Sequence, residues 1–144
     1  MTEPREGPVL DASALVARLL GEVGSDTVEV ILASGRAIAT PLAVAETLRT
    51  CRRRGFAMDQ GEILQYLESR NLHVEPVLPD DMQAIAANIE LCDDYRVSDR
   101  NAGALSIADA TCIAVAQRLG VPVVVSDGYW NNLDFGDVEI IQFR

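Results

Sequence analysis

The segment from Leu105 to Val125 constrains the fold most, because it joins a long helical pattern to an uninterrupted apolar run. Leu105 to Leu119 carries apolar residues at helical spacing, and Gly120 follows in the position of a helix-ending glycine. Val121 to Val125 is then a continuous apolar run, which is typical of a strand covered on both faces. We therefore expect a mainly parallel sheet with helices on either side.

The amino-terminal half alternates strand and helix patterns, which is the order that produces parallel pairing. Thr40-Pro41 is a favourable helix start, with a hydroxyl at the N-cap and proline in the first turn. The pattern predicts strands at 8–10 and 37–39 and helices at 12–21, 25–33 and 41–54.

The carboxyl-terminal half continues this alternation. Asp59 is a helix-capping residue, and the Asp80-Asp81 pair begins another helix that runs through Ile85 and Ile89. Further predictions are a strand within 71–78, a polar loop at 93–103 and a last strand at 138–143. Together these elements predict one three-layer α/β domain over residues 1–144, with a central sheet flanked by helices.

Composition limits both the location and the chemistry. The 144 residues include three separated cysteines, which fits reduced thiols. We find no signal peptide and no apolar stretch long enough for a membrane span. We therefore expect a cytoplasmic protein. All 12 basic residues are arginine, which excludes reactions that need a lysine. The net charge of -10 opposes nucleic-acid binding unless metal cations or a basic partner offset it.

Four acidic residues occupy positions where the predicted elements end or border the core. Asp11 and Asp127 each follow an apolar run directly, so both should emerge at the carboxyl edge of the sheet, where ligands collect in such folds. Glu46 and Asp109 lie beside the apolar stripes of their helices. Carboxylates that converge from four elements would bind Mg²⁺ or Mn²⁺, and such a site hydrolyses phosphodiesters without a protein nucleophile.

These residues carry a family resemblance that spans Val9 to Phe143. The segments around the four acids are Val-Leu-Asp11-Ala-Ser13-Ala-Leu, Thr40-Pro-Leu-Ala-Val-Ala-Glu46-Thr-Leu, Leu105-Ser-Ile-Ala-Asp109-Ala and Val-Ser-Asp127-Gly-Tyr-Trp130. In order and spacing they resemble the successive motifs of PIN domains, and among these the VapC toxins most closely.

The resemblance implies a Mg²⁺- or Mn²⁺-dependent ribonuclease whose catalytic and metal-binding residues are Asp11, Glu46, Asp109 and Asp127. It also implies Ser13 as an accessory hydroxyl, and we add Ser126 to that role. A small antitoxin protein often pairs with such toxins, and they commonly dimerise, so RNA, an antitoxin and a second copy of the chain are the expected partners.

One departure from the family pattern supports an alternative function. Such domains often carry Thr or Ser two residues before the last acid, whereas this chain has Val125, with Ser126 displaced by one position. A missing hydroxyl would weaken metal organisation. The alternative is a PIN fold kept as a protein-interaction module with weak or absent nuclease activity.

Each acid also has a purely structural interpretation. Asp11 could cap the helix that follows it, and Asp109 fits the last position of a capping box that begins at Ser106. Glu46 could be a solvated helical acid, and Asp127 with Gly128 could be a turn. The occurrence of all four in family order favours the metal site.

Other residues have weaker functional interpretations. Arg49, Arg52 and Arg53, with Arg54 beside them, form the dense basic run of an acidic chain, so they could contact an RNA backbone, although a solvated helix end is the commoner explanation. His73 is expected to be structural. Trp130 could stack on a base, but packing under the last strand is the favoured prediction.

Overall fold

A computed structural model describes residues 7–98, 104–126 and 128–144. The sheet consists of β1 (Val9–Leu10), β2 (Ile38–Ala39), β3 (His73–Val74), β4 (Val123–Val125) and β5 (Ile140–Gln142). Its strand order is β3-β2-β1-β4-β5, and all four pairings are parallel. The α/β prediction with a mainly parallel sheet is confirmed.

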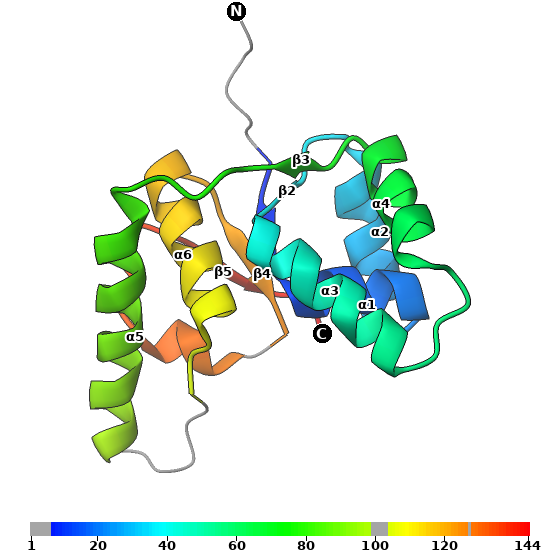
Figure 1. Ribbon diagram of the computed structural model, residues 1–144. Helices are drawn as coiled ribbons and strands as arrows, with labels where there is room; N and C mark the ends of the chain where they lie inside the picture. Colours follow the sequence, from blue (N-terminus) through cyan, green and yellow to red (C-terminus); the bar gives the residue numbers. More distant parts are fainter. Residues whose placement is uncertain (1–6, 99–103, 127) are drawn as a thin grey trace, which may run out of the picture.

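In the described part of the chain, six α-helices cover the two faces of this sheet (Figure 1). One side carries α1 (Ala12–Leu20), α2 (Ser25–Ala33), α3 (Pro41–Arg53) and α4 (Gln60–Ser69), and the other carries α5 (Asp81–Ser98) and α6 (Ile107–Leu119). A short 3-10 helix, η1, spans Gly128–Asn132. The molecule therefore has three layers, helices on sheet on helices.

Alternation along the strands shows that both sheet faces are buried. Val9, Val123 and Val125 belong to the apolar cluster that includes α5 and α6, whereas Leu10 and Val124 belong to the cluster with α1, α2 and α4. All five side chains have no exposed surface. Full burial of a side chain of this size contributes about 1.5 to 3 kcal/mol, which explains why the strand sequences are apolar at every position.

Helix starts follow the capping residues in the sequence. Thr40 Oγ1 accepts a hydrogen bond from the Ala43 amide at 3.1 Å, and Pro41 occupies the first helical position of α3. Asp59 caps α4 through the Glu62 amide at 2.8 Å, and the Glu62 side chain accepts a bond from the Asp59 amide. These caps satisfy amides that have no partner inside the helix.

Two predicted boundaries are wrong. The loop predicted at 93–103 begins too early, because α5 continues to Ser98; residues 99–103 lie outside the described part of the chain. No glycine or proline interrupts this stretch before Gly103, and Cys92 is buried in the cluster shared with α6, so packing extends the helix. The helix predicted from Leu105 begins at Ile107, because Ser106 is its N-cap.

Candidate active site

Asp11 is fixed at the carboxyl end of β1 by two hydrogen bonds. Its Oδ1 accepts one from the Ala14 amide at 2.9 Å and another from Ser13 Oγ at 2.6 Å. Asp11 is thus the N-cap of α1, as its structural interpretation predicted, and it is only 3% exposed. The cap does not exclude a second role, because Oδ2 is not used in either bond.

Asp11 stands where the direction of the sheet changes. The chain passes from β1 to β2 on one side, whereas β4, the other neighbour of β1, leads to β5 on the opposite side. In open parallel sheets this switch point is where ligands bind, at the carboxyl ends of the strands. Ser126, half-buried, follows β4 at the same edge, and Asp127 lies outside the described residues.

Glu46 and Asp109 reach the same region from two helices. Glu46 lies in the first half of α3 with its side chain exposed, and Asp109 lies in the first turn of α6, half-buried. The Asp109 amide donates to Ser106 Oγ at 3.1 Å, so the backbone of Asp109 takes part in a helix cap. Its carboxylate is close enough to act electrostatically on Asp11, as is that of Glu46.

The pKa of the Asp11 carboxyl reports this environment. This pKa is raised from 3.8 to about 7, and burial is the largest cause. The hydrogen bonds from Ser13 and Ala14 oppose this rise, whereas the charges of Asp109 and Glu46 add to it. When Asp11 is ionised here, its negative charge is repelled by the charges of Asp109 and Glu46. Its burial has also removed most of the water that would solvate that charge. A cation placed among the three acids would offset both costs.

Beneath the acids lies a buried contact between α3 and α6 that the sequence did not indicate. The buried Cys112 Sγ lies 3.8 Å from Thr40 Oγ1, a contact that joins the start of α3 to α6. Burial raises the pKa of the Cys112 thiol well above its ordinary value, and the Asp11 charge adds to this effect. Cys112 therefore stays a neutral packing residue, and only its position, one turn after Asp109, could have suggested its proximity to the site.

The described residues fit a divalent cation in charge and in donor chemistry. Neither Asp11 nor Glu46 forms an ion pair within the described part of the chain. Carboxylate oxygens are the ligands that Mg²⁺ and Mn²⁺ prefer. Across residues 7–98, 104–126 and 128–144, however, no group of three or more acidic, cysteine or histidine side chains is arranged so that it could hold a metal ion. Such a site would have to be completed from Asp127 or from substrate and water.

The residues with weaker functional interpretations do not gather at the acid site. Arg49 and Arg53 are exposed on α3, and Arg52 lines a hollow between α3 and α4 together with Phe56. His73 bonds Glu75 at 2.6 Å, which agrees with its expected structural role. Trp130 is 4% exposed and packs in the core cluster, so the prediction that it packs is confirmed and base stacking is disfavoured.

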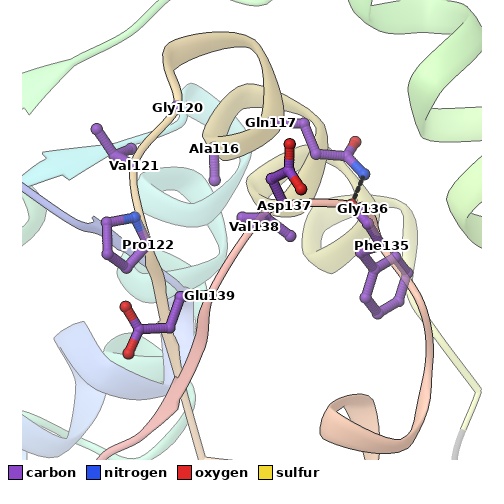
Figure 2. Close-up of a pocket in the computed structure, with 10 residues that line it drawn as sticks. All are labelled: Ala116, Gln117, Gly120, Val121, Pro122, Phe135, Gly136, Asp137, Val138 and Glu139. Atoms are coloured by element: carbon purple, nitrogen blue, oxygen red, sulfur yellow. Dashed lines mark hydrogen bonds between the residues drawn. The ribbon is translucent and has the colours of Figure 1, made fainter.

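A hollow of about 460 Å³ lies at the opposite edge of the sheet from Asp11. Figure 2 shows Val121 and Pro122, which precede β4, together with Asp137 and Glu139 from the segment that leads into β5. Gln117 closes one side by donating to the Phe135 carbonyl at 2.8 Å (Figure 2). This hollow contains none of the predicted acids and is separate from the candidate active site.

Comparison with known proteins agrees with this arrangement. The family model described as PIN domain matches residues 9–136, from the first residue of β1 to beyond η1. The chain belongs to the PIN domain family. No curated protein sequence matches it.

Several solved structures share this PIN fold. VapC20 of Mycobacterium tuberculosis, a sarcin-ricin loop cleaving toxin, is 20% identical with a TM-score of 0.62, over 92% of this chain and 99% of that one. VapBC-5 of the same organism, from a family of toxin-antitoxin systems, is 27% identical with a TM-score of 0.59, over 96% and 99%. FitAcB of Neisseria gonorrhoeae is 17% identical with a TM-score of 0.59, over 94% and 96%.

Within its described residues, the PIN domain has no helix that combines the length and the apolar character needed to cross a bilayer.

Proposed function

We propose that this PIN domain is a Mg²⁺- or Mn²⁺-dependent endoribonuclease, the toxin of a VapBC-like toxin-antitoxin pair. The observation that carries the proposal is the buried Asp11 carboxyl at the switch point of the sheet, with the charges of Asp109 and Glu46 acting on it. The likeness to VapC20 and to VapBC-5 supports the choice of RNA and of an antitoxin.

The proposed chemistry assigns distinct work to each residue. A divalent metal held by Asp11, Glu46, Asp109 and Asp127 would supply positive charge to activate water and to neutralise the phosphate oxygens. Ser13 and the Ala14 amide hold Asp11 Oδ1 in place, which leaves Oδ2 to face a ligand. Glu46 is exposed, so it is accessible to water and substrate, whereas Asp11 is shielded from both. Ser126, next to Asp127, would orient the last ligand.

Cleavage of RNA compared with DNA tests the proposed substrate class. We expect a labelled single-stranded RNA to be cut internally in Mn²⁺, and DNA of the same sequence to be cut more slowly or not at all. Glu46→Gln should abolish cutting, because it removes a charge while keeping the size of an exposed side chain. Glu90→Gln, an exposed acid on α5, is the matched control and should cut normally. Equal cutting by Glu46→Gln would contradict the proposal.

The alternative, a protein-interaction module, makes a different prediction about metal. Val125 is fully buried in β4 and packs in the core, so at this position the chain offers no hydroxyl to the site. A module of this kind would bind Mn²⁺ weakly or not at all in calorimetry. Measurable Mn²⁺ binding by wild type that is lost in Glu46→Gln favours the nuclease.

We also propose a homodimer and a cytoplasmic setting. Val30 on α2 and Leu64 on α4 are 72% and 45% exposed, which leaves apolar surface for a second copy. The three cysteines are buried thiols that form no disulfide, as reducing conditions allow. Light scattering at tens of micromolar should give twice the 15.6 kDa chain mass, whereas a monomer at that concentration would argue against the dimer.

A further inference from the structure

A small hollow adjoins the proposed active site and has no role in the chemistry assigned above. Its volume is about 180 Å³, and it lies between α1, α3 and the residues that follow β5. We call it the α1–α3 hollow; its polar lining consists of Ser13, Glu22, Glu46, Thr50, Arg54 and Arg144. Glu46 and Ser13 belong also to the acid site, so the hollow adjoins that site.

The α1–α3 hollow changes in charge along its length. Glu46, Thr50 and Arg54 are spaced four residues apart, so they lie along one line of α3 that ends at its C-cap, Arg54. The two ends of that line are separated by roughly 12 Å. The acid end is the proposed metal site. Arg144, from beyond β5, adds a second guanidinium to the lining of the same hollow.

The two arginines have donors available in this hollow. Arg54 Nη1 bonds Glu22 Oε2 at 2.9 Å, and this pair lies near the surface, with side chains 53% and 32% exposed. The Arg144 guanidinium lies 5.2 Å from the centre of the Phe143 ring, and Arg144 forms no ion pair with any residue that the structure describes. The lining holds two carboxylates, Glu22 and Glu46, and two guanidinium groups. Where Glu46 binds the metal of the proposed function, Glu22 alone opposes the two arginines.

We propose that the α1–α3 hollow binds a phosphate of the RNA strand next to the bond that is cut, through Arg54 and Arg144. Guanidinium groups bind phosphate oxygens in pairs of hydrogen bonds, and Thr50 adds a hydroxyl on the same helix line. The volume lies below the roughly 300 Å³ at which pockets for drug-sized ligands begin, so it suits one unit of a chain.

This inference rests on the proposed nuclease function, because the phosphate is placed relative to a strand that enters the acid site. An acidic side chain of a protein partner would offer similar chemistry to the two arginines. RNA is favoured because Glu46 lines the hollow, and a strand cut at the acids has phosphates on both sides of the cut.

Binding of uncut RNA tests the proposal without depending on activity. The probe is a short labelled single-stranded RNA of mixed sequence, measured by anisotropy in EDTA over a range of salt. Arg54→Gln with Arg144→Gln should weaken binding at least about tenfold and lower the salt slope by about 0.7 for each phosphate that the protein no longer neutralises. The control, Arg36→Gln with Arg96→Gln, makes the same change in net charge at two exposed arginines outside the hollow.

Glu22→Gln adds a test of opposite sign. It removes the carboxylate that holds Arg54, so RNA should bind more tightly. If the Arg54–Glu22 ion pair has only a structural role, RNA should bind the variant equally or more weakly. Equal weakening by both double variants, or an effect on antitoxin binding alone, would overturn the proposal. If wild type neither binds nor cuts RNA, the nuclease function itself is refuted. If wild type binds and cuts RNA, and the Arg54→Gln/Arg144→Gln variant binds RNA equally well, only the phosphate site is refuted.

Discussion

Asp11→Asn should make the metal-free protein more stable at about pH 8, by on the order of 2 to 4 kcal/mol in the free energy of unfolding. The folded protein holds Asp11 at a pKa of about 7, while the unfolded chain ionises it near 3.8. Between these values the unfolded state binds fewer protons, so wild-type stability falls as pH rises from about 4 to about 7 and stays lower above that range.

Asparagine avoids this loss without disturbing the cap. Its Oδ1 can accept the same bonds from Ser13 and Ala14, and asparagine is as good an N-cap as aspartate. Urea unfolding at several pH values should therefore show the variant and wild type converging near pH 4 and diverging toward pH 8. A variant less stable than wild type at pH 8 would mean that the charge is already compensated within the protein.

The second large effect concerns Arg118, at the end of α6. Arg118→Met should reduce the free energy of unfolding by on the order of 3 kcal/mol, because it leaves the buried Asp81 carboxylate without its cationic partner. Arg118 Nε bonds Asp81 Oδ1 at 2.9 Å, and Asp81 has a side chain only 3% exposed. Arg118 Nη1 also bonds Glu75 at 3.0 Å, and Nη2 donates to the Pro76 carbonyl at 3.0 Å.

These bonds fasten the segment between β3 and α5 to the end of α6. Arg54→Met is the matched control, because it breaks one ion pair whose side chains are 53% and 32% exposed, and such pairs contribute roughly 0 to 1 kcal/mol. Guanidinium unfolding of the two variants should separate them clearly. If both variants lose the same amount of stability, the burial of Asp81 does not determine how much the Arg118 hydrogen bonds contribute to the free energy of unfolding.

Local signals were enough to predict most elements. Thr40-Pro41 and Asp59 mark helix starts by hydrogen bonds that form within a few residues, and the structure has helices that begin there. The run at Val121 to Val125 predicted a strand buried on both faces, and the three valines of β4 are fully buried. The predicted loop at 93–103 was wrong because packing between distant segments determines where this helix ends. α5 runs past Asp93, since its apolar side packs on α6.

In the candidate site, too, some features follow from the local sequence and others depend on packing between distant segments. The position of Asp11 at a strand end follows from the sequence, whereas its raised pKa depends on burial and on charges brought from α3 and α6. Arg144 illustrates the limit, since it is 90 positions from Arg54 and only the parallel pairing of β5 brings it to the same hollow. No pattern along the chain could have indicated that proximity.

The central claim is that the acid cluster cuts RNA with a divalent metal, and single-turnover cleavage of a labelled RNA tests it most directly. Wild type and Asp11→Asn are stripped with EDTA and then supplied with increasing Mn²⁺. We predict no cutting in EDTA, recovery in wild type as Mn²⁺ rises, and a rate at least about 100-fold lower in Asp11→Asn, because removal of residues that only support metal ligands already costs roughly 10- to 100-fold. Cutting that persists in EDTA, or an Asp11→Asn variant that recovers like wild type, would contradict the account.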